Sequence, residues 1–408
     1  MEPEEAEALG LQVFGELRRE VVWLNGAARS ALPSRTLEVG EEALRRKAHT
    51  PWDIGDTSAV ADDVRALFAA LLGEGARAED VFLTPSCSYA ISLAARNLRA
   101  RLTGERRRVL VLQDQMHSNV LPWQALCDEE GGELLVVPRP ADYDWAAAVV
   151  AALERGGVAV CAVAPCHWCD GSVVDLEAIG AACRMHDVAL VVDGTQWIGA
   201  APPIDAVRIG ACFVACSVHK WLLSPYGCCL CFASPPFWRA ASPLEHHDRN
   251  REGAQHVECL PMDPSGRYPA AFMHGARRLD SGGRPSYILL PMLRESLQLL
   301  AGPLAAPRLS AALRRHTSHV AARAAALGFD VPPRHAPHIV GLRPAAGMPS
   351  AEAIVDSLAR RPTPVLVSAR LGAVRVSPHL WSTRRDVELL LEGLAEAVAA
   401  EAGAHSRL

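Results

Sequence analysis

The chain has 408 residues, half of them hydrophobic, and a formal net charge of −5. It is long enough for one large core and a second smaller one, and its mixed charges form no basic face of the kind that binds nucleic acid. The acidic N-terminus lacks a hydrophobic targeting core, and no apolar run approaches the roughly 18 residues of a membrane span. We therefore expect a cytoplasmic protein that binds neither nucleic acid nor membrane.

The predicted elements begin with an amphipathic segment over residues 1–22 and a mostly helical region over 36–72. From Val81 onward, short apolar strands alternate with helices. Strands are expected at 81–84, 109–112, 134–137, 158–164, 188–192, 212–217 and 227–232, and helices at about 87–101, from 114–123 onward, at 145–154 and at 176–185. This alternation predicts a mostly parallel sheet with right-handed crossovers.

The regular pattern ends after the last of these strands. Residues 235–275 are irregular, which indicates a long surface excursion or a dimer contact. A long helix from Tyr287 leads out of the sheet, and residues after about Leu300 form a smaller α+β unit. We predict an N-terminal segment that packs with the small domain (1–25), a large domain (26–295) and a small domain (296–408).

The twelve cysteines lie largely in strand-like apolar runs, where a reduced cysteine behaves as a small hydrophobe. Cys166 and Cys169 have the CxxC spacing of a redox pair or of half a zinc site. No second pair follows at zinc-finger spacing. We expect structural or site-lining thiols and no metal, with a zinc site at this pair as the alternative.

Lysine occurs only at Lys47 and Lys220, and arginine carries nearly all the remaining positive charge. Lys47 lies in a charged, solvated stretch. Lys220 follows an apolar strand and precedes three apolar residues, so burial should lower the pKa of its amine and expose a nucleophile. A lysine kept where arginine cannot substitute indicates a Schiff-base amine. The alternative is a snorkelling or ion-paired lysine at a strand end.

Asp193 ends a run with the length and branching of a buried parallel strand. Ligands of open α/β sheets bind beyond the carboxyl ends of strands, so this carboxylate should face a site. Pyridoxal phosphate requires a lysine for its aldehyde and an aspartate that keeps its ring nitrogen protonated. An isolated strand-end aspartate is usually a cap, so the pair of Asp193 and Lys220 carries the inference.

Four stretches of sequence occur in one order over most of the chain: residues 113–124 (QDQMHSNVLPWQ), 192–196 (VDGTQ), 217–222 (SVHKWL) and 375–383 (RVSPHLWST). Together they resemble the class V aminotransferases of pyridoxal-phosphate fold type I, which include cysteine desulfurases, isopenicillin-N-epimerase-like proteins and kynureninase. The resemblance implies an enzyme that uses pyridoxal 5′-phosphate on an amino acid. It also implies a mostly parallel sheet between helices, with a smaller α+β C-terminal domain.

The resemblance assigns roles to individual residues. Lys220 would hold the cofactor and move the α-proton, Asp193 would hold the ring nitrogen, and His117 would stack on the ring and shuttle protons. Further cofactor contacts are expected from Ser86, Cys87, Ser88, Gln196, Ser217 and His219. The hydroxyl-rich turn at Ser86 offers backbone N–H groups to the phosphate, and Ser86 can at the same time be the helix cap.

The substrate contacts follow from the same resemblance. Arg375 would bind the α-carboxylate bidentately, with a surface strand arginine as the alternative. The further candidates for the substrate pocket are Asn25, Ala28 and Trp168. Residues 277–285 resemble the loop that reaches the neighbouring active site, so we expect a homodimer in which the neighbour's Ser281 or Gly283 contributes.

We expect an aminotransferase, with C–S β-elimination or amino-acid epimerisation as alternatives that differ in proton placement. A non-catalytic cofactor-binding protein is the alternative of another class. We expect one chemistry of the family to be absent here, the transfer of sulfur to a protein cysteine. The resembling enzymes carry that cysteine on a mobile loop shortly before the carboxylate-binding arginine. Residues 359–370 contain none, and no cysteine follows Cys259. The remaining thiols that could approach the cofactor are Cys87, Cys166 and Cys169.

Overall fold

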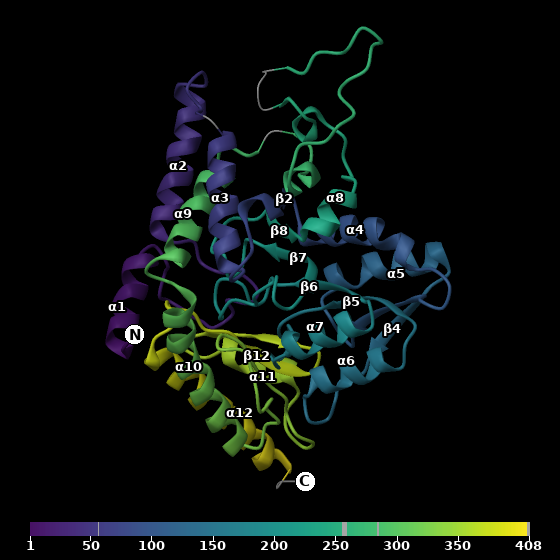
Figure 1. Ribbon diagram of the computed structural model, residues 1–408. Helices are drawn as coiled ribbons and strands as arrows, with labels where there is room; N and C mark the ends of the chain where they lie inside the picture. The colour runs from purple at the N-terminus through teal and green to yellow at the C-terminus, as the bar shows by residue number, and fades with distance from the viewer. Residues whose placement is uncertain (56, 255–258, 284, 406–408) are drawn as a thin grey trace.

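The computed structural model describes residues 1–55, 57–254, 259–283 and 285–405. A seven-stranded sheet lies at the centre of the larger part of the molecule (Figure 1). Its strands, in spatial order, are β2 (Val81–Thr84), β8 (Cys229–Ala233), β7 (Ala211–Ser217), β6 (Ala189–Asp193), β5 (Val158–Val163), β3 (Arg108–Leu112) and β4 (Glu133–Val137). Neighbouring strands are parallel except where β8 meets β2 and β7. The predicted mostly parallel α/β sheet is confirmed.

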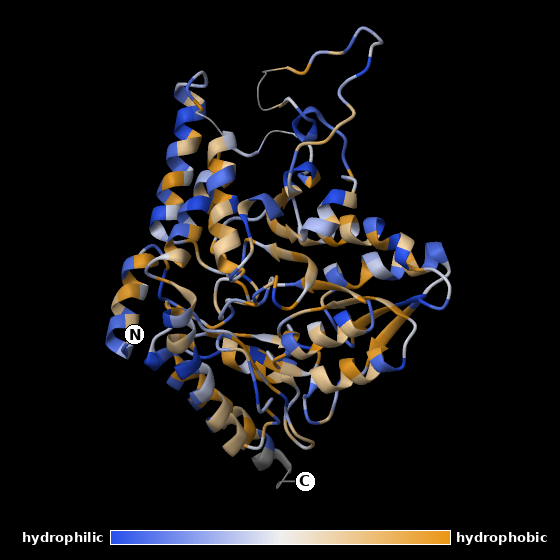
Figure 2. Cartoon of the chain, viewed as in Figure 1, coloured by the Kyte–Doolittle hydropathy of each residue, from blue (hydrophilic) through white to orange (hydrophobic). Residues whose placement is uncertain are grey.

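Helices cover both faces of the sheet. On one face lie α4 (Cys87–Leu98), α5 (Leu121–Glu130) and α8 (Pro235–Ala240); on the other lie α3 (Thr57–Leu71), α6 (Trp145–Glu154), α7 (Leu176–Met185) and α9 (Leu289–Ala301), with α2 (Ser34–His49) packed beside α9. Alternate residues of β3 pack into the hydrophobic cores on opposite faces of the sheet. Leu110 and Leu112 belong to one core, and Val109 and Val111 belong to the other. Strands covered on both faces are therefore apolar along most of their length, as Figure 2 shows for the central strands.

The C-terminal part contains a second, antiparallel sheet of β11 (Ser368–Arg370), β12 (Ala373–Val376) and β9 (Val340–Leu342). Its helices are α10 (Ala306–Ala326), α11 (Ala351–Ala359) and α12 (Arg384–His405). The N-terminal helix α1 (Pro3–Val13) precedes β1 (Val22–Trp23), which pairs in parallel with β10 (Val365–Leu366). The start of the chain thus completes the C-terminal part.

The predicted boundary between residues 295 and 296 falls inside α9. Ser296 is buried in the middle of that helix, where its hydroxyl donates to the carbonyl of Leu223 (2.8 Å) on the large-domain side. We therefore propose that the small domain begins after Gly302, the residue that ends α9.

Between α8 and α9, the described residues form only short elements, among them a 3₁₀ turn at Asp248–Asn250, and part of this region extends away from the body of the molecule at the top of Figure 1. This agrees with the irregular pattern of the sequence there. None of the helices in the described residues is long and apolar enough to cross a membrane.

An aromatic cluster joins α1, the loop after β7 and the segment after β12. His379 is fully buried and stacks on Trp381 with 4.6 Å between ring centroids, while the edge of Phe14 meets both rings. Neither imidazole nitrogen of His379 has a hydrogen-bond partner among the described residues. Burial, reinforced by the nearby His338, lowers the pKa of His379 from 6.5 to about 3, so the buried ring is neutral.

We expect the free energy of unfolding to fall as the pH falls from about 6.5 to about 3. In this window an unfolded histidine binds a proton that buried His379 does not, so protons favour the unfolded state. The contribution of one such histidine is at most about 1.4 kcal/mol per pH unit. His379→Phe keeps an aromatic ring in the cluster and should flatten the pH dependence by about this amount.

Urea unfolding at pH 7 and pH 5 measures this difference. His49→Phe, at an exposed position of α2, serves as the matched control and should leave the pH dependence unchanged. An equal loss of stability on acidification in wild type and His379→Phe would contradict the expectation.

Candidate active site

One cavity lies where four parallel strands reach their carboxyl ends, at Leu112, Ala164, Asp193 and Ser217. It is lined by Cys87, Leu112, Gln115, Met116, Ser118, Ala164, Cys166, His167, Trp168, Asp193, Thr195, Gln196, Ser217, His219 and Lys220. The carboxyl ends of parallel strands are the usual position of a ligand site in an open α/β sheet. The fold therefore brings together residues that are up to 133 positions apart, from Cys87 to Lys220.

Lys220 lies in the loop that leaves β7, with its side chain in the cavity. Burial lowers the pKa of its amine, nearby Asp193 raises it, and the charge of Arg375 lowers it further. Ser30 donates a hydrogen bond to the carbonyl of Lys220, and Leu223 closes the loop in a left-handed backbone conformation (φ 56°). A partly buried amine with a lowered pKa fits the nucleophile that the sequence indicated, and this role stays a prediction.

Asp193 is the last residue of β6 and is almost fully buried. One carboxylate oxygen accepts from the backbone N–H of Thr195 (3.0 Å), and the hydroxyl of Thr195 accepts from the backbone N–H of Ser217 (3.1 Å). The other carboxylate oxygen has no hydrogen-bond partner among the described residues. A carboxylate held rigidly beside the cavity is suited to accept a hydrogen bond from the protonated ring nitrogen of pyridoxal phosphate.

The predicted phosphate turn opens helix α4. Ser86 is the N-cap, and its hydroxyl accepts from the backbone N–H of Tyr89 (3.1 Å). Cys87 lines the cavity, whereas the side chains of Ser86 and Ser88 are exposed and do not. The backbone N–H groups of Cys87 and Ser88 make no hydrogen bond within the helix, so they remain available to an anion at the positive end of its dipole.

Ser217 and His219 line the same cavity. The imidazole of His219 stacks on the ring of Tyr226 with 3.9 Å between centroids. Burial, together with the neighbouring Lys220, lowers the pKa of His219 to about 4, so the ring is neutral and can donate one hydrogen bond. This arrangement is compatible with the predicted cofactor contact of His219, which stays a prediction.

Arg375 lies on β12, only 1 % exposed, and no carboxylate of the described residues pairs with it. One guanidinium nitrogen donates to the carbonyl of Trp168 (2.9 Å), the guanidinium carbon lies 5.8 Å from the Trp168 ring centre, and Nε has no partner. Burial lowers its pKa to about 10, so it remains cationic at neutral pH. Arg375 is not among the residues that line the cavity, but Trp168, whose carbonyl it binds, is one of them. A buried cation beside the cavity fits a substrate carboxylate, and this role stays a prediction.

The structure does not place His117 at the cavity. Its side chain is exposed at the start of a 3₁₀ turn (His117–Asn119), and the preceding Met116 and the following Ser118 line the cavity instead. Successive residues of a tight turn point in different directions, so Met116 and Ser118 face the cavity in this structure and His117 does not. The stacking role of His117 stays a prediction.

Asn25 and Ala28 also lie outside the set of residues that line the cavity. The Asn25 side chain accepts from the hydroxyl of Ser368 (3.2 Å) and thus connects the N-terminal segment to β11. The same segment contacts cavity residues through Ala27, whose carbonyl accepts from Gln196 (3.1 Å), and through Ser30, which donates to the carbonyl of Lys220. Trp168, by contrast, lines the cavity as expected and donates from its indole to the carbonyl of Asp114 (2.7 Å).

Sequence reasoning did not single out several cavity residues. Gln115, Met116, Ser118 and Thr195 lie inside the stretches that carried the family resemblance, so that signal could have found them. His167 lies outside the four stretches that carried the family resemblance, so that resemblance could not have indicated it. It stacks on Trp145 with 5.2 Å between ring centroids, and its Nε2 bonds the carbonyl of Gln113 (3.0 Å).

The thiols near the site are all free and buried. Burial raises the pKa of Cys169 to about 12 and also raises that of Cys166, while a hydrogen bond with Cys229 and burial raise that of Cys87. Within the described residues, no group of three or more histidine, cysteine, aspartate or glutamate side chains is arranged to hold a metal ion. Because their pKa values are raised, Cys87, Cys166 and Cys169 are protonated at neutral pH.

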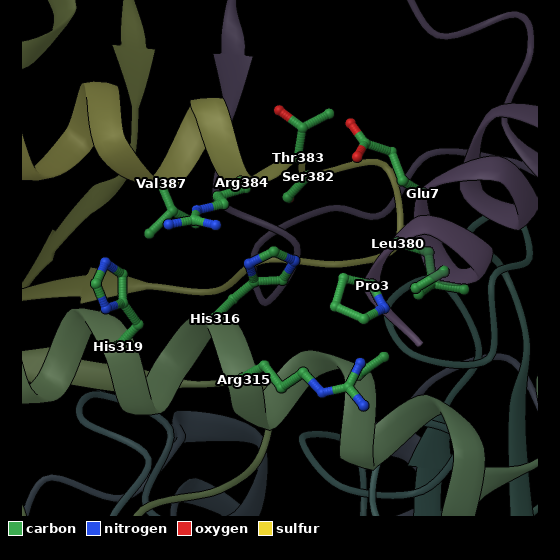
Figure 3. A pocket seen from close by; sticks show the side chains of 12 residues that line it. Pro3, Glu7, Arg315, His316, His319, Leu380, Ser382, Thr383, Arg384 and Val387 are labelled. Carbon is green, nitrogen blue, oxygen red and sulfur yellow. The ribbon is translucent and has the colours of Figure 1, made fainter. Parts of the chain in front are cut away.

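A second cavity, of about 220 Å³, lies between α1, α10 and the start of α12 (Figure 3). Its side chains include Glu7 from α1, Arg315, His316 and His319 from α10, and Arg384 from α12. None of the predicted site residues lines it. We assign it no part in the chemistry at Lys220.

A parallel sheet that holds a buried lysine and an aspartate at its carboxyl end defines a pyridoxal-phosphate-dependent enzyme of fold type I. The family model "Aminotransferase class-V" matches residues 22–259. The chain belongs to the class-V aminotransferase family and uses pyridoxal phosphate, for which Lys220, Asp193 and the α4 turn provide fitting groups.

Similar proteins agree with this family. A cysteine desulfurase of Klebsiella pneumoniae is 28 % identical over 244 residues, which cover 57 % of this chain and 59 % of that relative. The structure of the cysteine desulfurase CsdA from Escherichia coli has a TM-score of 0.80 at 18 % identity, covering 98 % of this chain and 99 % of CsdA. A complex of the cystine C–S lyase C-DES with cysteine persulfide has a TM-score of 0.79 at 19 % identity, covering 94 % and 99 %.

Proposed function

We propose that this enzyme cleaves the C–S bond of a cysteine-type amino acid by β-elimination. The relatives support this reading, because one is named a cysteine desulfurase and a solved structure of the same fold is named a cystine C–S lyase. The aminotransferase reaction that the sequence favoured is replaced by the lyase alternative. The observation that carries the proposal is the buried Arg375, which has no anionic partner among the described residues and binds the carbonyl of Trp168 beside a cavity whose thiols are all buried.

The bound cofactor supplies an electron sink for the substrate α-carbon. We propose that Arg375 binds the substrate carboxylate and that Lys220, with its lowered pKa, removes the α-proton. Asp193 would keep the ring nitrogen protonated. Loss of the proton and departure of the sulfur from Cβ then release 2-aminoacrylate, which water hydrolyses to pyruvate and ammonia.

We propose that the sulfur leaves directly on a small molecule. The connection between α11 and β10 spans residues 360–364 and contains no cysteine, and Arg361 binds it to Glu396 of α12. Cys87, Cys166 and Cys169 are buried and their pKa values are raised, so none is a ready thiolate. These features argue against transfer of sulfur to the protein.

The products of cystine and of cysteine test the proposal. We expect pyruvate and ammonia in equal amounts, with cystine also yielding a persulfide, whereas desulfuration would yield alanine. Alkylation after incubation, followed by mass spectrometry of the peptides, should find no substrate-dependent persulfide on any of the twelve cysteines. Alanine as the main product, a protein persulfide, or a keto acid formed only with an amino acceptor would overturn the proposal.

The cytoplasmic location of the enzyme remains a prediction. We further propose that the enzyme is a homodimer. Ser281 and Gly283 line a separate surface cavity with Arg65, Asp280 and His247, not the cavity that holds Lys220 of the same chain. They are therefore free to approach a neighbouring subunit. Arg284 of the same predicted loop lies outside the described residues.

A further inference from the structure

The side-chain amide of Gln196 is fixed from both ends where it reaches the cofactor cavity. Its Oε1 accepts from the indole Nε1 of Trp221 (2.8 Å), and its Nε2 donates to the carbonyl of Ala27 (3.1 Å). All three residues are buried. Because an amide nitrogen carries two hydrogens, one N–H of Gln196 remains for a group inside the cavity.

These two partners select one orientation of the amide. If the oxygen and nitrogen of Gln196 exchanged places, the NH₂ group would face the Trp221 donor and the oxygen would face the Ala27 carbonyl. Both contacts would be repulsive and would leave buried polar groups without partners. Loss of the Trp221 donor would remove half of this selection.

Trp221 is itself locked in place. The edge of His338 packs against its ring with 4.2 Å between centroids, and a Cβ at Gly26 would lie 3.4 Å from the indole. His338 also donates from Nε2 to the backbone carbonyl of Gln196 (2.7 Å). The backbone and the side chain of Gln196 are therefore both held by one buried aromatic cluster.

We propose that Trp221 is a positioning residue that keeps the donor face of Gln196 toward the cofactor. This inference rests on the use of pyridoxal phosphate and on the predicted cofactor contact of Gln196, which the family resemblance assigns to the ring oxygen. A donor at this negatively charged oxygen stabilises the deprotonated form of the bound cofactor. An amide oxygen at the same place would destabilise that form, so the orientation of Gln196 sets the pH at which the bound cofactor loses its proton.

Trp221→Phe tests the proposal, because phenylalanine keeps an aromatic ring in the cluster but has no N–H. The readout is the visible absorption of the cofactor-loaded protein as a function of pH, without substrate. We expect its midpoint to rise by about one pH unit. Trp197→Phe is the matched control, since this neighbouring indole donates to the carbonyl of Pro202 (2.7 Å), and it should leave the midpoint unchanged.

A double variant separates positioning from a general loss of packing. Gln196→Leu should raise the midpoint by itself, and Trp221→Phe added to it should cause no further rise. An unchanged midpoint in Trp221→Phe, or additive shifts in the double variant, would overturn the proposal. If the phenylalanine variant does not fold, β-(3-benzothienyl)alanine at position 221 removes the N–H while keeping the shape of the ring.

The titration contains no substrate, so its outcome is independent of the reaction catalysed. An unchanged midpoint together with pyruvate formation would refute the role of Trp221 and leave the C–S lyase proposal intact. A shifted midpoint without pyruvate formation would support the role of Trp221 and refute the C–S lyase proposal.

Discussion

Replacement of Lys220 by alanine is expected to abolish the covalent attachment of pyridoxal phosphate and to lower turnover by at least about 10⁴-fold. Lys220 is the only lysine in the cavity, and burial lowers the pKa of its amine, so no other described side chain there can replace it as both nucleophile and base. Wild-type protein should be yellow. Borohydride reduction followed by peptide mass spectrometry should find the cofactor on Lys220 alone.

Lys47→Ala is the matched control, because Lys47 is the other lysine of the chain and lies over the Tyr287 ring at 5.7 Å, outside the cavity. It should retain both the yellow colour and full turnover. A borohydride-reducible adduct that persists in Lys220→Ala would remove the basis of the proposed mechanism.

Replacement of Arg375 by leucine is expected to lower kcat/KM for a cysteine-type substrate by about 10²–10³-fold. The guanidinium is buried and pairs with no carboxylate of the described residues, and a bidentate bond to the substrate carboxylate would supply the missing anion. Folding stability should change little or rise, because leucine removes an unpaired buried charge. Activity and stability should therefore change independently.

Two comparisons make this prediction specific to the carboxylate. Wild type should strongly prefer cysteine to cysteamine, which lacks the carboxylate, and Arg375→Leu should lose most of that preference. Arg370→Leu removes a neighbouring positive charge on β11 and should keep the preference. Equal use of cysteine and cysteamine by wild type would show that Arg375 has another role.

The parts of the site that could be predicted from sequence are those in which the chemistry restricts the residue type. Only lysine can provide the amine at position 220, and an aspartate at a strand end has few other uses when such a lysine follows. The alternation of apolar strands and helices placed both residues at the carboxyl end of one sheet. The structure finds them beside the same cavity.

Other assignments could not be settled from sequence, because neighbouring residues differ only in the direction of their side chains. His117 and Met116 are adjacent in a tight turn, and the pattern of the sequence does not tell which side chain faces the cavity. Asn25 and Ala28 lie in the correct segment, but it is the carbonyl of Ala27, a group that every residue carries, that meets Gln196. A backbone contact leaves no trace in residue type.

The sequence by itself determined the fold class and the cofactor through local periodicity, residue chemistry and the family resemblance, and it predicted Lys220 and Asp193 as the two residues that the cofactor requires. Tertiary structure alone decided the orientation of Gln196, since its partners Ala27 and Trp221 come from distant segments that only folding joins. It also decided that Arg375 is buried without an anion and that the thiols near the site are protonated. Burial and pairing depend on which segments meet in space, and neither property belongs to any one stretch of the chain.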